Sequence, residues 1–104
     1  MTKTTNLPKH DKNTTVNARL LALRVIDSVF SNGAYSNIAL NKVFSANKVS
    51  DLDRRFITEL VYGSIKAKGT LDWIIGQNVS RSLNKISPII LNILRLGAFQ
   101  IYFL

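Results

Sequence analysis

Residues 89–104 read Ile89-Ile90-Leu91-Asn92-Ile93-Leu94-Arg95-Leu96-Gly97-Ala98-Phe99-Gln100-Ile101-Tyr102-Phe103-Leu104 and form the most hydrophobic part of the chain. Apolar side chains surround most of the circumference of such a helix, which is typical of a helix covered by other helices in a bundle. Ser87-Pro88 precedes it, a capping hydroxyl followed by proline at its preferred first helical position. The chain ends without a glycine cap, a basic last turn or a proline, so we expect a fragment that stops within or just after this fifth helix.

The segments upstream show the three- and four-residue spacing of apolar side chains that indicates amphipathic helices. We predict one helix over 16–32, ended by Gly33, and a second over 36–46. A third begins at the capping box Ser50-Asp51-Leu52-Asp53 and ends with Lys66 and Lys68 in its last turn. A short fourth begins with Thr70 as its cap.

No segment alternates apolar and polar residues for long enough to predict a strand. The fold class is therefore all-α, a bundle of antiparallel helices on short connections. Ile38 and Leu52 should point inward, and Trp73 should be a core or interface anchor and not a base-stacking platform. Arg19 lies toward the apolar side of its helix, so we expect an ion pair with Glu59 or Asp53.

Residues 1–14 contain almost no apolar side chain and cannot offset the entropy of ordering, which predicts a disordered basic tail before a helical domain over 15–104. The sequence shows no secretory signal and no uncharged run of membrane-spanning length, so we expect a cytoplasmic protein without a membrane partner. The chain has no cysteine. Disulfides, thiolate zinc sites and a cysteine nucleophile are therefore excluded from it.

The formal net charge is +8, with its excess in the first two dozen residues and in the loop before the last helix. Such a positive field attracts polyanions, so RNA or DNA is the expected partner. The sequence shows no pattern of residues that is typical of a metal site, a phosphate-binding loop or a catalytic nucleophile. The single histidine, His10, has no second metal ligand at suitable spacing, the glycines are isolated, and no nucleophile has a base beside it. We predict no catalytic, cofactor-binding or metal-binding residue in this segment.

Five motifs, in this order and spacing, resemble the N-terminal domain of the RsmB family of bacterial small-subunit rRNA cytosine methyltransferases. They are Arg19-Leu20-Leu21-Ala22-Leu23-Arg24-Val25, Gly33-Ala34-Tyr35-Ser36-Asn37-Ile38-Ala39-Leu40, Asp53-Arg54-Arg55-Phe56-Ile57-Thr58-Glu59-Leu60-Val61-Tyr62-Gly63, Leu71-Asp72-Trp73-Ile74-Ile75 and Ile93-Leu94-Arg95-Leu96-Gly97-Ala98-Phe99-Gln100. The resemblance covers about 15–104. It implies a NusB-like helical RNA-binding fold with two further helices beyond Leu104.

The resemblance also implies a parent enzyme that transfers a methyl group from S-adenosylmethionine to carbon five of a cytosine in ribosomal RNA. That chemistry needs a cysteine thiolate, so it would reside in a C-terminal catalytic domain of the same chain. Ribosomal RNA and that catalytic domain are the implied partners. Two alternatives stay open: a free-standing NusB-type transcription antitermination factor, and a helical interaction domain whose basic charge is incidental.

The expected RNA-contacting residues are all basic and come from two arguments. The NusB-like fold implicates the basic N-terminal region, here Lys9, Lys12 and Arg24. Charge and expected exposure add Lys66, Lys68, Arg81 and Lys85, together with Arg54. Arg55 has Glu59 one helical turn away and is expected to form a surface pair.

Overall fold

The computed structural model describes residues 18–104, which form α-helices and one 3-10 turn and contain no strand. The predicted all-α fold is confirmed, while the predicted tail over 1–14 lies outside the described residues. The N-terminal helix occupies residues 18–32 and ends at Gly33, whose φ of 70° takes the left-handed conformation that favours glycine. The other elements are α2 (Ser36–Ala46), α3 (Asp51–Lys66), α4 (Lys68–Asn78), the 3-10 turn Leu83–Lys85 and α5 (Pro88–Phe103).

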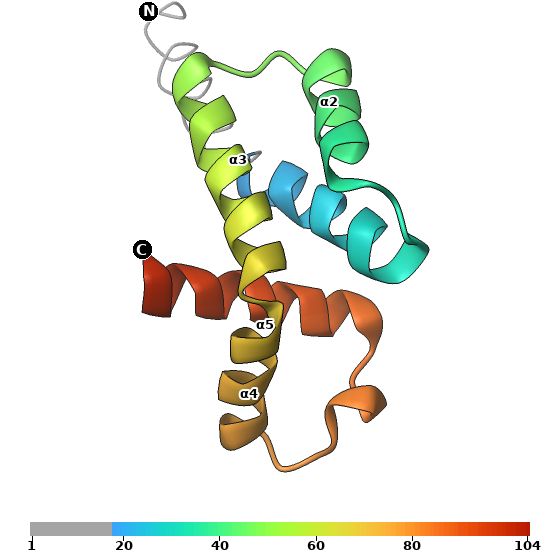
Figure 1. Ribbon diagram of the computed structural model, residues 1–104, viewed down its shortest axis with the longest axis vertical. Helices are drawn as coiled ribbons and strands as arrows, with labels where there is room; N and C mark the ends of the chain where they lie inside the picture. Colours follow the sequence, from blue (N-terminus) through green and yellow to red (C-terminus); the bar gives the residue numbers. More distant parts are fainter. Residues whose placement is uncertain (1–17) are drawn as a thin grey trace, which may run out of the picture.

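The helices cross one another around a junction near the middle of the molecule. Figure 1 shows α3 and α4 following each other along the longest axis, with α5 lying across the point where they meet. α2 packs beside α3, and α5 contacts both α3 and α4. α3 and α4 are separated by Ala67 alone, so they act as one long support for the other helices.

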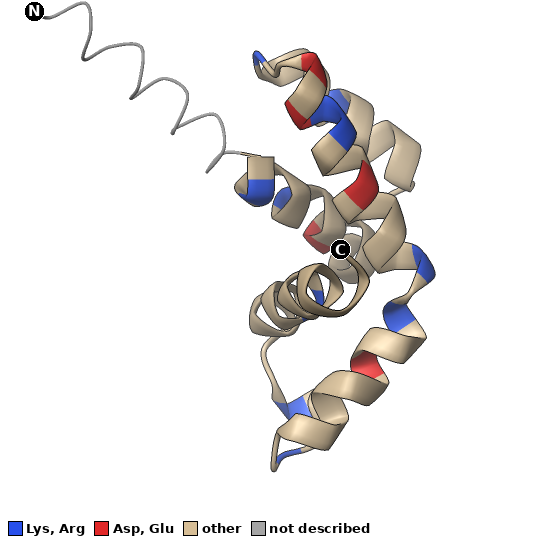
Figure 2. Ribbon diagram, turned by 90° about the vertical axis from the view of Figure 1, so that its left-hand side faces the viewer, with Lys and Arg blue, Asp and Glu red and all other residues tan. Residues whose placement is uncertain are grey.

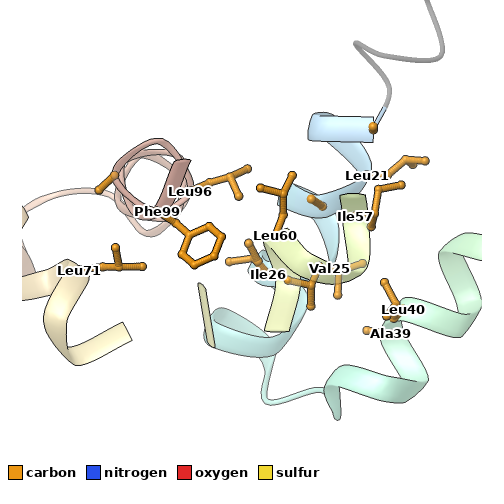
Figure 3. Close-up of a cluster of buried hydrophobic side chains, with 14 residues drawn as sticks. Leu21, Val25, Ile26, Ala39, Leu40, Ile57, Leu60, Leu71, Leu96 and Phe99 are labelled. Carbon is orange, nitrogen blue, oxygen red and sulfur yellow. The ribbon is translucent and has the colours of Figure 1, made fainter. Parts of the chain in front are cut away.

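The core forms where the N-terminal helix, α3 and α5 meet. In Figure 3, the Phe99 ring of α5 has Leu71 of α4 on one side and Leu60 of α3 on the other. The apolar face that helical spacing predicts for the N-terminal helix is confirmed, because its members are buried or pack against the core: Ala18, Leu21, Ala22, Val25, Ile26, Val29 and Phe30. The most deeply buried apolar side chains are Ala22, Val25, Ile26, Ile57, Leu60, Val61 and Leu71.

Several local expectations are wrong. Ile38 is 54% exposed and Leu52 is 75% exposed, because no described element covers the outer side of α2 or the first turn of α3. α4 begins at Lys68 and not at Thr70, since the Leu71 amide already donates to the Ala67 carbonyl oxygen at 2.8 Å. Lys68 therefore belongs to α4.

The predicted ion pair of Arg19 is also wrong. Arg19 is exposed, and its Nε donates to Oε1 of Gln100 on α5 at 2.8 Å. Its guanidinium lies 5.3 Å from the centre of the Phe56 ring. The residue therefore faces the end of α5 and an aromatic ring of α3, and it forms no salt bridge with the described carboxylates.

The Ser50 half of the predicted capping box of α3 is confirmed and leads to a test, whereas the reciprocal bond from the Ser50 amide to the Asp53 carboxylate does not form. The Ser50 hydroxyl oxygen accepts a hydrogen bond from the Asp53 amide at 3.2 Å. We expect Ser50→Ala to lower the free energy of unfolding by about 1 kcal/mol, measured by urea denaturation. The predicted cap of α5 by the Ser87 hydroxyl is wrong, because the Ser87 side chain makes no capping bond. Ser87 holds the same position before α5 and is therefore the matched control. An equal loss in Ser50→Ala and Ser87→Ala would contradict the role of the Ser50 cap.

Candidate nucleic-acid interface

The predicted RNA-contacting cations do not gather on one patch. Arg24 lies on the N-terminal helix, Arg54 near the start of α3, and Lys66 and Lys68 on either side of Ala67. Arg81 and Lys85 follow α4, while Lys9 and Lys12 lie outside the described residues. Figure 2 shows basic positions spread along the molecule, whose longest extent is 52 Å.

Lys68 is the weakest of these candidates. Its Nζ lies 3.6 Å from Oδ2 of Asp72 and 5.7 Å from the centre of the Phe30 ring. Part of its charge is therefore already neutralised within the protein. Lys66 and Arg54 are exposed and form no salt bridge with the described carboxylates, although the Arg54 guanidinium lies over the Phe44 ring at 4.8 Å.

Arg81 and Lys85 are brought together in one cleft, which we call the α4–α5 cleft. It has a volume of about 520 Å³ and is lined by Asn78, Val79, Ser80, Arg81, Lys85, Ile86, Ser87, Ile90 and Leu94. Two hydrogen bonds shape the loop that carries these residues: the Lys85 amide donates to the Ser82 carbonyl oxygen, and the Ser82 hydroxyl donates to Oδ1 of the Asn84 side chain. The chain contains no carboxylate side chain from Trp73 to Leu104. The charge of the cleft is therefore positive and uncompensated by its own lining.

A second groove pairs Arg24 with a residue that was not among the expected RNA contacts. Arg24 of the N-terminal helix and Lys42 of α2 both line a groove of about 350 Å³. Ile38, Val43 and Asn47 contribute to the same lining. Lys42 is visible in the sequence as an outward residue of its helix, but only the packing of α2 against the N-terminal helix places it beside Arg24.

Arg95 is basic but unavailable to RNA, because it is 7% exposed and bound within the protein. Its Nε donates to Oδ1 of Asp72 at 2.7 Å, and its Nη2 donates to Oδ2 of the same carboxylate at 3.0 Å. Its Nη1 donates to Oδ1 of Asn92 at 2.9 Å, and its guanidinium lies 4.9 Å from the centre of the Phe30 ring. The pairing is bidentate, the geometry that suits a buried guanidinium best.

The bonds around Arg95 continue to the N-terminal helix. Asn92 Nδ2 donates to Oδ1 of Asp27 at 2.9 Å, and the same oxygen accepts from the Ser31 hydroxyl at 3.1 Å. This polar network, Asp27, Asn92, Arg95 and Asp72, ties the N-terminal helix and α4 to α5. The sequence signal for it was a lone arginine in the most apolar helix, which must have a partner when buried.

Trp73 was predicted to be a core or interface anchor, and it is 66% exposed. Its place in the core is therefore wrong, whereas a role at an interface is compatible with the structure. No group of three or more potential metal ligands occurs among residues 18–104. Within the same residues, no helix is both long and apolar enough to cross a bilayer.

The sequence profile of the NusB family matches residues 16–104. The chain belongs to the NusB family. The NusB-like fold expected from the sequence motifs is thereby confirmed, and it agrees with the all-helical structure. No solved structure matches the chain.

The relatives of this NusB domain include proteins named for rRNA methylation. The chain is 36% identical over 86 residues to the probable ribosomal RNA small subunit methyltransferase B of Bacillus subtilis, covering 83% of the chain and 19% of that protein. It is 34% identical over 89 residues to the protein of the same name from Synechocystis, covering 86% of the chain and 20% of that protein. The ribosomal RNA small subunit methyltransferase B of Cronobacter sakazakii is 27% identical over 88 residues, which cover 85% of the chain and 20% of that protein. The chain thus spans about a fifth of the length of these relatives.

Proposed function

We propose that this NusB domain is the RNA-binding N-terminal domain of an S-adenosylmethionine-dependent small-subunit rRNA (cytosine-5) methyltransferase of the cytoplasm. Its role is to hold ribosomal RNA beside a C-terminal catalytic domain. The names of the relatives support the enzyme class. The observation that carries the RNA-binding role is the α4–α5 cleft, where Arg81 and Lys85 line one cavity without a carboxylate.

Phosphate oxygens are the ligands that such a cleft favours. Arginine binds phosphate through parallel N–H groups, and lysine acts as a point charge beside it. Contacts of this kind fix the position and orientation of the nucleic acid without reading its sequence. The domain would therefore supply affinity and placement, and the choice of the target cytosine would belong to another part of the enzyme.

The methyl transfer itself would use residues outside this chain. A cysteine thiolate must add to the cytosine ring before carbon five becomes nucleophilic, and this chain has no cysteine. The described helices also lack a strand followed by a glycine-rich turn, the usual element for a dinucleotide-like cofactor. S-adenosylmethionine, which supplies the methyl group, does not fit the described residues and would be held by the catalytic domain.

The alternative is a free-standing NusB-type antitermination factor that regulates transcription. The relatives favour the enzyme, because the proteins from Bacillus subtilis and Synechocystis, at 36% and 34% identity, are both named as probable rRNA methyltransferases. The reading frame of the parent gene distinguishes the two. Continuation into a parallel α/β domain with a glycine-rich loop and paired cysteines supports the methyltransferase, whereas a stop after two more helices supports the factor.

Removing the charges of the α4–α5 cleft should weaken RNA binding in a salt-dependent way. For the double variant Arg81→Ala/Lys85→Ala, we expect the slope of log K against log salt to fall by about 0.7 to 0.9 for each RNA phosphate that the protein no longer neutralises. Lys66→Ala should act in the same direction. Lys68→Ala should change the slope less, because its Nζ already lies 3.6 Å from Asp72. Filter binding to ribosomal RNA fragments at several salt concentrations measures these slopes.

The predicted surface pair of Arg55 with Glu59 is wrong, because Arg55 forms no salt bridge with the described carboxylates. The matched control for charge is therefore Lys48→Ala/Arg55→Ala, which removes two exposed cations that do not line the cleft. An effect of equal size in this control would show that only total charge matters. Absence of any binding by the unmodified chain at low salt would overturn the RNA-binding role and favour an incidental charge.

A further inference from the structure

The groove that contains Arg24 and Lys42 has aliphatic walls, and we call it the α2 groove. Arg24 of the N-terminal helix and Lys42 of α2 are both exposed, and the groove that they line has a volume of about 350 Å³. None of the described carboxylates lines it. Most of the remaining lining is aliphatic: Val25, Ala34, Ile38, Ala39, Val43 and Ala46. The α2 groove therefore combines apolar surface with two cations that its own lining does not neutralise.

The same surface continues over the outer side of α2. Ile38, Lys42 and Ala46 are spaced by four residues, so they follow one another along one face of the helix. These three residues also line a second hollow of about 430 Å³ on α2, and Ile38 is 54% exposed. Exposed aliphatic surface beside uncompensated charge is typical of a binding surface for another macromolecule.

The chemistry of the lining favours a helix of a protein partner over a nucleic acid strand. Unpaired bases stack on aromatic side chains, and no aromatic residue is found in the described lining of the α2 groove. An extended peptide needs the free backbone groups of a sheet edge, whereas residues 18–104 contain no strand. An amphipathic helix needs only an apolar groove, which it fills with anchors at i, i+3 or i+4 and i+7. The 11 residues of α2 give the groove a length of roughly 16 Å, enough for about three turns of such a helix.

The charges of the groove specify an acidic partner. Like charges repel, which disfavours two occupants that the chain itself could supply. Residues 1–17 contain three lysines and one aspartate, and a second copy of the chain has the same net charge of +8. A helix with carboxylates beside its apolar stripe would instead be attracted to the groove, and its charges would fix its register.

We infer that the α2 groove binds an acidic amphipathic helix of another protein. Aliphatic side chains of this helix pack against Ile38 and Val43, and its carboxylates pair with Arg24 and Lys42. This inference goes beyond the proposed function. It assigns Arg24 to a protein partner, while the α4–α5 cleft remains the site for RNA.

The probe is a short synthetic peptide with leucine at i, i+3, i+4 and i+7 and glutamate at most other positions. One control peptide has the same composition in scrambled order, and another keeps the leucine stripe but has lysine in place of glutamate. Binding to the full chain is measured by fluorescence anisotropy. Arg24→Ala/Lys42→Ala removes the cations of the groove, and Lys48→Ala/Arg55→Ala is the matched control, because it removes two exposed cations that do not line the groove.

A second pair of variants tests the apolar part of the groove. Ile38→Asn and Ile93→Asn are matched in chemistry and close in exposure, since the two isoleucines are 54% and 45% exposed. Ile38 lines the α2 groove, whereas Ile93 lies on α5 and does not line it. Circular dichroism checks that each variant keeps the helical content of the parent chain.

We expect the acidic striped peptide to bind more tightly than both control peptides. Arg24→Ala/Lys42→Ala and Ile38→Asn should each weaken its binding about fivefold, through the loss of two charge pairs and of one apolar contact respectively. The two matched control variants should change binding less than about twofold. Arg81→Ala/Lys85→Ala removes cations of the other cleft and should leave peptide binding unchanged.

Three results would overturn the inference. The first is no binding of the acidic striped peptide, or equal binding of its scrambled form. The second is an equal loss in the groove variants and in their matched controls, which would show that only total charge or general surface polarity matters. The third is an Arg24→Ala/Lys42→Ala variant that binds a single-stranded RNA oligonucleotide more weakly but binds the peptide normally, which would assign the groove to nucleic acid. None of these results concerns Arg81 or Lys85, so the proposed function is tested separately.

Discussion

Asp72→Ala is expected to lower the free energy of unfolding by about 3 kcal/mol, the lower end of the range for breaking a buried ion pair. Asp72 accepts two hydrogen bonds from Arg95, whose side chain is only 9% exposed. Without the carboxylate, the guanidinium stays buried between α4, α5 and the N-terminal helix with its charge uncompensated. Urea denaturation of the variant and the parent chain measures the difference.

Two further variants separate the ion pair from general effects. Lys68→Ala removes the other cation on Asp72, which is 46% exposed and 3.6 Å away, so it should cost less than about 1 kcal/mol. The double variant Asp72→Ala/Arg95→Met should be more stable than Asp72→Ala, because methionine removes the buried charge and keeps most of the apolar volume. If Asp72→Ala lost no more stability than Lys68→Ala, the pair would not hold α4 to α5.

Gly63→Ala is expected to destabilise the domain by about 1 to 2 kcal/mol, although alanine is the better helix former. Gly63 of α3 lies where α5 crosses, and a Cβ at this position would overlap the end of the Phe99 ring. Phe99 is 6% exposed and its ring is stacked on Phe103 with 5.5 Å between centroids, so it has little room to move. The cost of overpacking should exceed the gain in helix propensity. Thermal or urea unfolding gives the sign.

Gly76→Ala is expected to raise the free energy of unfolding, in contrast to Gly63→Ala. A Cβ at Gly76 of α4 would meet no other atom within 4 Å, so alanine should stabilise the domain by about 0.5 to 1 kcal/mol through helix propensity alone. The double variant Gly63→Ala/Phe99→Leu should lose less stability than the sum of its single changes, since the smaller side chain relieves the overlap. Stabilisation by both Gly63→Ala and Gly76→Ala would show that the crossing of α3 and α5 tolerates a methyl group.

Helix boundaries were largely predictable because capping and breaking residues act over a few neighbouring positions. Ser50 caps α3, Pro88 begins α5 and Gly33 follows the N-terminal helix, as expected from local chemistry. The wrong start predicted for α4 also came from reading local capping residues. Thr70 was a reasonable cap, but Ala67 let the chain turn directly from α3 into α4 without a polar side chain.

The burial of side chains was predicted correctly on the helix faces that meet the core, and wrongly for apolar residues that lie beyond the reach of a neighbouring helix. Ile38, Leu52 and Trp73 follow the apolar spacing of their helices, yet all three are more than half exposed. Helical periodicity says which side chains share a face, but it contains no information on how far a neighbouring helix extends over that face. The partner of Arg19 was wrong for the same reason, because Gln100 is distant in sequence.

In the candidate site as well, some features follow from the sequence and others only from the packing of the helices. The family resemblance suggested Arg24, and charge with expected exposure suggested Arg81 and Lys85, whereas only the packed helices placed Arg81 and Lys85 in one cleft and Lys42 beside Arg24. Family membership agrees with motifs that are visible in the chain, since their order and spacing are properties of the sequence.

By itself, the sequence determined that this chain is helical and basic and contains no cysteine, because propensity, charge and composition belong to single residues or to close neighbours. The tertiary structure alone decided which cations lie on the surface and which are bound inside the protein. Arg95 and Arg81 carry the same charge, but Arg95 is bound to Asp72 and Arg81 lines a cleft without a carboxylate. The difference depends on contacts between helices, and such contacts form only when residues far apart in the chain are packed together.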